Sequence, residues 1–139
     1  MDRDVTALRQ IGDPRLEVME ADLEAAPWPL PGRRFAAVAV ANYLHRPLLP
    51  TLVEAVDEGG ILLYETFAAG NERYGRPRNP DFLLHPGELL EAVRDRLTVL
   101  AYEHGLIERP RPAVVQRIAA CRPVTNSTPL PIDPKAASA

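Results

Sequence analysis

Apolar positions along the chain follow two spacings. Residues 4–11, 47–60 and 86–97 carry apolar side chains at helical spacing, next to proline or glycine, which predicts three amphipathic helices. Residues 35–41 and 61–67 are largely apolar throughout, as in strands that are covered on both faces. Strand and helix therefore alternate through the middle of the chain, and this alternation predicts a parallel sheet with helices on its faces.

Three further segments have strand patterns. Residues 16–20 alternate apolar and polar side chains before a proline-rich loop, which predicts a short strand. Residues 97–102 and 113–120 are the last two strand candidates, and the loop between them, 103–112, has no helical pattern. They are expected to pair as an antiparallel hairpin. The predicted fold class is α/β, with a Rossmann-like, mostly parallel sheet that ends in an antiparallel C-terminal hairpin.

Length and composition bound the domain organisation. The chain has 139 residues, of which 46% are hydrophobic, so one compact domain is expected. We assign this domain to residues 1–122. Residues 123–139 are rich in proline and small polar residues, which predicts a disordered tail.

Charge and targeting signals narrow the location and the partners. Acidic residues outnumber basic ones by 19 to 16, and the basic residues are dispersed, which disfavours nucleic acid as a partner. The apolar runs fall far short of the roughly 20 residues that a membrane-spanning helix needs, so no membrane association is expected. No signal-peptide pattern is present, and Cys121 is the only cysteine. A cytoplasmic location is therefore expected.

Several catalytic classes lack their motifs in this sequence. There is no histidine and cysteine cluster for zinc, no GxSxG string and no GxxxxGK string, so no metal site, serine hydrolase or nucleotide triphosphatase is expected. In open α/β sheets, small ligands bind beyond the carboxyl ends of the strands. The segments at those ends are residues 2–4, 20–24, 42–46 and 65–78, and they are the candidate site.

These segments resemble a known family. Residues 1 to about 122 are similar to class I S-adenosylmethionine-dependent methyltransferases, particularly to small bacterial members likened to tellurite-resistance methyltransferases. The similarity is carried by the strings EADLE, VANYLHRPLLP, GGILLYETFAAGNERYG and RNPDFLLHPGELL, in that order. It implies S-adenosyl-L-methionine as the cofactor, a small-molecule methyl acceptor and a sheet with the strand order 3-2-1-4-5-7-6.

The resemblance implies four cofactor-binding residues. Asp2 stands where the family binds the ribose hydroxyls, and a carboxylate can accept two hydrogen bonds from a diol. Asp22 matches the position that contacts the adenine amino group, and Leu23 would pack near the ring. Asn42 is expected near the methionine portion or the acceptor. The alternatives are that Asp2 is a solvated terminal residue and that Asp22 only caps a turn.

The resemblance also implies candidates for the transfer step and the acceptor. Tyr43 would line the methyl-transfer face, and His45 would be a proton acceptor, because imidazole titrates near neutral pH. A structural role for His45 is the alternative, and methyl transfer does not require a dedicated base. Four polar residues are expected to bind the acceptor, namely Glu65, Asn71, Arg73 and Tyr74. The alternative for the arginines of this loop is a solvated rim.

One part of the family pattern has no counterpart in this sequence. The first strand, its glycine-rich loop and the first helix would precede Asp2, so we interpret the chain as an N-terminally truncated member. The hypothesis for the truncation is a misplaced gene start at Met1. Truncation would leave strands with unpaired edges. The competing functions are therefore a noncatalytic remnant that forms a homodimer or binds a partner through an exposed sheet edge, and a different nucleotide-binding α/β protein.

Overall fold

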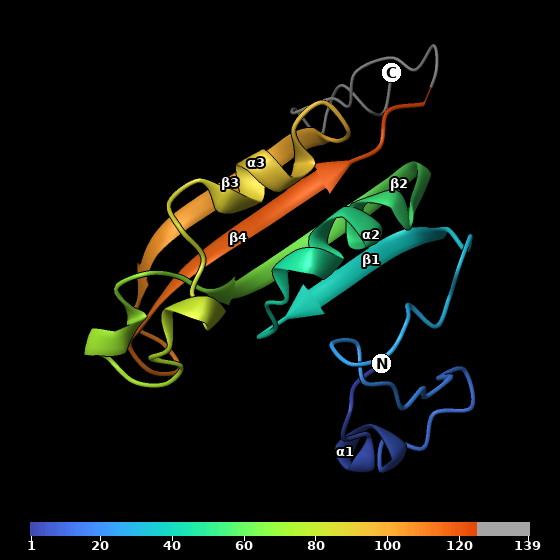
Figure 1. Cartoon of the computed structure of the whole chain (residues 1–139), viewed down its shortest axis with the longest axis horizontal. Coiled ribbons are helices and arrows are strands. Elements are labelled where there is room, and N and C mark those ends of the chain that lie inside the picture. The colour runs from blue at the N-terminus through green and yellow to red at the C-terminus, as the bar shows by residue number, and fades with distance from the viewer. Residues whose placement is uncertain (125–139) are drawn as a thin grey trace, which may run out of the picture.

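The computed structural model describes residues 1–124 and contains one four-stranded sheet (Figure 1). The strands are β1 (Phe35–Ala41), β2 (Val56–Phe67), β3 (Thr98–Ile107) and β4 (Ala113–Cys121). The helices are α1 (Thr6–Arg9), α2 (Leu49–Glu54) and α3 (Glu88–Val93), with the 3-10 turns η1 (Arg46–Leu48), η2 (Asn71–Arg73) and η3 (Pro80–Phe82). The strand order is β1-β2-β4-β3, so β1 and β3 are the two edge strands.

Strand direction confirms the hairpin and corrects the prediction of a mostly parallel sheet. β1 and β2 are parallel, whereas β4 is antiparallel to both β2 and β3. Only one of the three pairings in the described chain is therefore parallel. α3 carries the chain from β2 across to the far edge, where β3 forms, and the hairpin then brings β4 back between β3 and β2. This order is the one that strands 4, 5, 7 and 6 have in the family to which the sequence was compared.

The predicted strand at residues 16–20 does not form as a regular strand. Its only ladder contact is an isolated parallel bridge between Asp2 and Glu20. The alternating pattern is present, but within residues 1–124 no neighbouring strand extends the ladder. A strand without neighbours has few hydrogen bonds to hold it in an extended conformation.

The predicted helix at residues 47–60 is shorter than its pattern suggests. It consists of η1 and α2 and ends at Glu54, and β2 has already begun at Val56. Gly60 lies inside β2, where a Cβ atom would come within 2.9 Å of the Phe35 carbonyl oxygen. Gly59 has φ +70°. Gly60 therefore permits the close approach of β1, and Gly59 supplies the positive φ at the break in the pairing register, rather than ending a helix.

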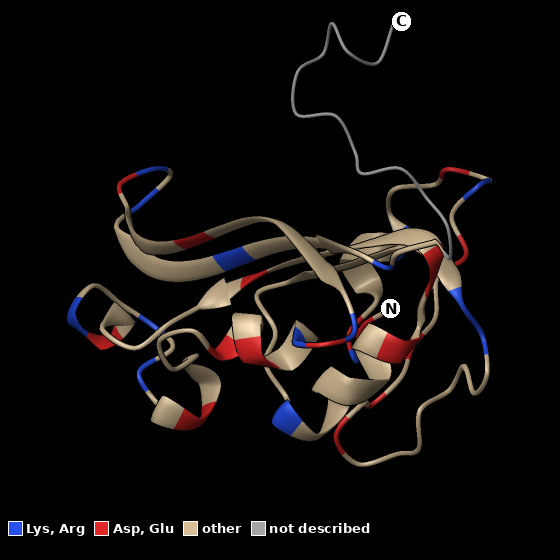
Figure 2. Cartoon of the chain, turned by 90° about the horizontal axis from the view of Figure 1, so that it is seen from above, with Lys and Arg blue, Asp and Glu red and all other residues tan. Residues whose placement is uncertain are grey.

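The helices α2 and α3 cover the same face of the sheet (Figures 1 and 2). Under them lies a buried apolar cluster that includes Leu52, Val53, Leu62, Tyr64, Leu89, Val93, Ile118 and Ala120. On the opposite face, no element of the described chain forms a second layer. We call this the open face, and it consists of Ala39, Ala41, Leu63, Glu65, Ala101, Glu103, Arg117 and Ala119. β1 was predicted to be covered on both sides, yet its burial alternates along the strand.

Two expectations concern the ends and the membrane. The predicted tail at residues 123–139 lies outside the described residues, apart from 123 and 124. Within the described part of the chain, no helix is long and apolar enough to cross a membrane.

Candidate functional site

Four of the predicted site residues meet in one small pocket. Asp2, Asp22, Leu23 and Tyr43 line a cavity of about 130 Å³ together with Arg3, Ala21 and Glu24. The bridge between Asp2 and Glu20 brings the first two segments together, since the Ala21 amide donates a hydrogen bond to the Asp2 carbonyl oxygen at 3.0 Å. Tyr43 approaches from the end of β1. We call this cavity the acidic pocket, because it has three carboxylates and one guanidinium.

The Asp22 carboxylate has both a structural contact and a charged neighbour. Its Oδ1 atom accepts hydrogen bonds from the backbone amides of Glu24 and Ala25, both at 3.0 Å. Its Oδ2 atom lies 3.9 Å from the guanidinium of Arg3. The Ala25 and Glu24 amides, helped by Arg3, lower the pKa of Asp22. Asp22 therefore caps the turn and is ionised at neutral pH, with its second oxygen free of any hydrogen bond inside the described chain.

Tyr43 is held by the turn that follows β1. Asn42 adopts a left-handed conformation with φ 54°, and its amide donates to the Glu65 carbonyl oxygen at 2.9 Å. The Tyr43 carbonyl oxygen accepts a hydrogen bond from the Tyr64 hydroxyl at 2.7 Å. Since Tyr64 lies in the core cluster, the backbone of Tyr43 is fixed to a rigid strand.

The Tyr43 hydroxyl has an unusual environment. Its oxygen atom is buried and has no hydrogen-bond partner within residues 1–124. Burial raises the pKa of Tyr43, and the carboxylates of Glu24 and Asp22 raise it further. The hydroxyl is thus protonated at neutral pH, so it can donate a hydrogen bond but is poorly suited to accept a proton.

The other strand-end residues do not join the acidic pocket. Glu65 lies on the open face, where its carboxylate accepts a hydrogen bond from the Arg117 guanidinium at 2.5 Å. The same guanidinium also donates to the Glu103 carboxylate at 3.1 Å. These three side chains line an open depression of about 650 Å³. Asn42 is exposed, and His45 precedes η1 without capping it through its side chain. Neither Asn42 nor His45 lines the acidic pocket.

Of the three predicted acceptor residues after β2, Asn71 and Tyr74 line the same cavity, and Arg73 does not. Asn71 is only 1% exposed, and its side chain links Pro77 to Val114. Arg73 is exposed on the surface. Tyr74 lines a second cavity of about 210 Å³, in which Arg76 and Arg111 also take part.

Sequence reasoning missed some of the residues that line these cavities. Arg3 and Glu24 lie within the strand-end segments that were identified, but only the family positions in them were singled out. Arg111 belongs to the hairpin loop, and no local signal connects it with the loop after β2. Among residues 1–124, no group of three or more His, Cys, Asp or Glu residues is arranged to hold a metal ion.

The acidic pocket can hold only part of an S-adenosylmethionine molecule. Its carboxylates suit the hydroxyl and amino groups of an adenosyl unit, and the Tyr43 hydroxyl offers one unused donor. Ligand pockets for small molecules usually measure about 300–1,000 Å³. At about 130 Å³ the pocket is well below this range. The residues therefore fit one portion of the cofactor in chemistry, and the pocket does not fit the whole molecule in size.

Comparisons with known proteins support the fold. No family model and no curated protein matches the chain. Among solved structures, the chain is similar to TehB from Haemophilus influenzae, with a TM-score of 0.50 and 18% sequence identity. The match covers 66% of this chain and 36% of the TehB chain, so this chain corresponds to about a third of that protein. The chain thus has a fold partly like that of TehB.

Proposed function

We propose that this chain takes part in S-adenosylmethionine-dependent methyl transfer to a small molecule, and that the acidic pocket binds the adenosyl portion of the cofactor. One observation carries the proposal. Asp2, Asp22 and Tyr43 come from three separate segments and meet at the strand-end side of a sheet that resembles TehB. This is the side on which open α/β sheets bind small ligands.

Each residue has a defined part in the proposed site. Asp2 and the free oxygen of Asp22 accept hydrogen bonds from the ligand's hydroxyl and amino groups, and Leu23 supplies an apolar wall. The excess of carboxylates also favours a positively charged ligand. When bound, S-adenosylmethionine supplies an electrophilic methyl group on a sulfonium. The chain's task is then to orient the donor and to exclude water, and Tyr43 acts as a hydrogen-bond donor rather than as a base.

Calorimetric titration with S-adenosylhomocysteine tests this proposal. The wild-type chain should release or absorb heat in a saturable manner. Asp22→Asn keeps an oxygen for the turn but removes the charge, and it should weaken binding about threefold or more. Asp13→Asn is the matched control, because Asp13 makes the same kind of turn, with an amide hydrogen bond at 2.9 Å from Arg15. Absence of saturable heat in the wild type, or equal binding by Asp22→Asn, would overturn the proposal.

The open face favours a second candidate, a noncatalytic protein that acts as a homodimer. The outer edge of β1 has no strand partner within residues 1–124. Leu63 on the adjoining open face is 46% exposed. A second copy that pairs with β1 and covers this face would bury both features. In that case the chain would self-associate and would not bind S-adenosylhomocysteine.

A further inference from the structure

One end of the molecule carries arginines that have no charged partner. They lie in the loop after β2 and in the β3–β4 turn, and both segments are at the same end of the sheet (Figures 1 and 2). The residues are Arg73, Arg76, Arg78, Arg109 and Arg111. Within the described part of the chain none of them forms a salt bridge or a side-chain hydrogen bond. Most other arginines in that part are paired with acids.

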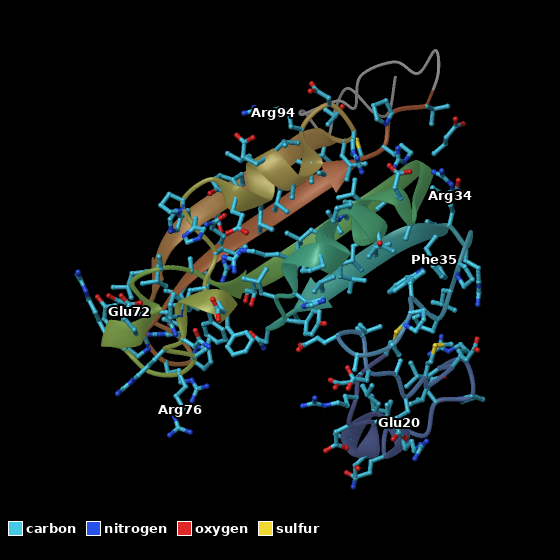
Figure 3. The ribbon with its side chains drawn as sticks, in the orientation of Figure 1. Glu20, Arg34, Phe35, Glu72, Arg76 and Arg94 are labelled. Carbon is cyan, nitrogen blue, oxygen red and sulfur yellow. The ribbon has the colours of Figure 1, made fainter. Side chains whose placement is uncertain are left out.

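Arginines outnumber acidic residues in these two segments. The five arginines stand against three acidic residues, namely Glu72 in the loop (Figure 3), Asp81 and Glu108. Within residues 1–124 none of these three carboxylates forms a salt bridge. The chain as a whole has a net charge of −3. A local excess of guanidinium groups on an otherwise acidic protein therefore marks this end as a site for anions.

Two of these arginines border a pocket. Arg76 and Arg111 come from the two different loops and line the 210 Å³ cavity with Tyr74 and Gly75. We call this cavity the basic pocket. Arg guanidinium groups match the geometry of carboxylate and phosphate oxygens, and a tyrosine hydroxyl can add a further hydrogen bond. The small volume suits one acid group with a short attachment, rather than a nucleotide.

Buried Asn71 holds the two walls of the basic pocket together. Its Nδ2 atom donates to the Pro77 carbonyl oxygen at 3.2 Å, one residue after Arg76. Its Oδ1 atom accepts from the Val114 amide at 3.1 Å, three residues after Arg111. A single side chain that is 1% exposed thus links both loops. The site is built on a fixed support, and Asn71 is a positioning residue for it.

We propose that the basic pocket binds the carboxylate or phosphate group of a small molecule, through Arg76, Arg111 and Tyr74. The pocket includes Phe67, the last residue of β2, so it lies at the end of the sheet where ligands are expected. The further identification of this molecule as the methyl acceptor rests on the proposed function. The acceptor would then be an acid.

Titration with inorganic phosphate and with acetate, monitored by NMR at constant ionic strength, tests the anion site. The Arg76 and Arg111 side-chain signals and the Gly75 amide should shift in a saturable manner with at least one of these ions, and not with chloride. Saturation with phosphate alone identifies a phosphate ester as the ligand class, and saturation with acetate alone identifies a carboxylate. Shifts no different from those in chloride would overturn the proposal.

Charge-removing variants distinguish anion binding in the basic pocket from a general effect of the protein's charge. The double variant Arg76→Gln and Arg111→Gln should reduce anion affinity about tenfold or more. The control double variant Arg15→Gln and Arg94→Gln removes the same charge from exposed sites elsewhere and should bind like the wild type. An equal loss of anion affinity in both double variants would overturn the proposal. Binding of a single-stranded oligonucleotide without binding of phosphate or acetate would also overturn it.

The two proposals fail in different ways. Anion binding without a response to S-adenosylhomocysteine would leave the basic pocket in place and remove its role as an acceptor site. A response to S-adenosylhomocysteine without anion binding would overturn the basic pocket alone.

Discussion

At the scale of single residues, the Tyr43 hydroxyl is the feature that most needs a ligand. A buried hydroxyl without a partner is costly, because it has lost its hydrogen bonds to water. Here the oxygen is buried between the end of β1 and the acidic turn at Asp22, and no described residue accepts its proton. A bound molecule with an acceptor atom in the acidic pocket would remove that cost.

Tyr43→Phe should separate binding from stability. Because the buried hydroxyl has no partner in the described chain and destabilises the fold, its removal should leave the free energy of unfolding unchanged or raise it by about 1 kcal/mol in urea denaturation. Affinity for S-adenosylhomocysteine should fall about three- to tenfold, as for one lost hydrogen bond. Tyr64→Phe is the control, since its hydroxyl bonds to the Tyr43 carbonyl oxygen, and it should cost about 1 kcal/mol. A large loss of stability in Tyr43→Phe with unchanged affinity would contradict this assignment.

The sequence could predict only part of the candidate site, for a geometric reason. The residues that line the acidic pocket meet for two reasons. The bridge between Asp2 and Glu20 joins the first two segments, and Tyr43 follows the end of β1 beside them. Glu65 was expected beside them, but it lies inside β2 on the open face. Side chains alternate between the faces of a strand, so a shift of one residue in the predicted strand end changes the face.

At the scale of elements, α3 is attached to η1, the turn before α2, by one ion pair. The guanidinium of Arg46 bonds the Glu88 carboxylate at 2.7 and 3.1 Å and also donates to the carbonyl oxygens of Asp81 and Leu83. The same carboxylate accepts the His85 amide at 2.7 Å. This network fixes the segment that leads into α3. The sequence pattern predicted a longer helix, through residue 97, whereas α3 ends at Val93.

Loss of this ion pair should change the acid stability of the fold. Burial opposes ionisation of Glu88, but the hydrogen bonds from Arg46 and the His85 amide outweigh it and lower the pKa of Glu88. A lowered folded-state pKa contributes stability above the unfolded carboxyl pKa of about 4.3, and this contribution is lost as the pH falls through the folded value. Glu88→Gln should therefore cost about 1–3 kcal/mol at neutral pH and show a weaker decline below pH ~4 in urea unfolding.

Glu91→Gln provides the control for Glu88→Gln. Glu91 pairs with Arg94 on the exposed side of α3, with side chains 60% and 65% exposed. Its loss should change stability little, since exposed pairs contribute about 0–1 kcal/mol. Identical pH profiles for wild type and Glu88→Gln would contradict the role given to the half-buried pair of Arg46 and Glu88.

Most elements could be predicted from the sequence, and the failures have a common cause. The strand at 35–41 and the closing hairpin were predicted because their patterns are local. Gly59 and Gly60 were interpreted as the end of a helix, whereas both lie inside β2 and Gly60 allows close contact with β1. The direction of β4 relative to β2 also depends on partners distant in sequence. Local pattern does not contain this information.

At the scale of the whole molecule, residues 1–124 cover the sheet on one side only. Small alanine side chains and Leu63 dominate the open face, with the Arg117 ion pairs between them. The match to TehB covers 36% of that chain. An apolar sheet face and a free β1 edge are expected to attract a further protein layer.

Leu63→Glu tests whether a second copy supplies that layer. Sedimentation velocity should show concentration-dependent dimers for the wild type and mainly monomer for Leu63→Glu. The fold should persist, since Leu63 is 46% exposed. Ile11→Glu is the control, because Ile11 is 61% exposed away from the open face, and it should associate like the wild type. A wild type that stays monomeric at every concentration would rule out the homodimer.

The central claim is that the acidic pocket binds an adenosyl group, and NMR mapping with S-adenosylhomocysteine tests it most directly. Saturable shifts should concentrate on the amides of residues 2–3, 21–24 and 43, which line the pocket. Shifts spread over the open face, or no saturable shifts at all, would contradict the claim.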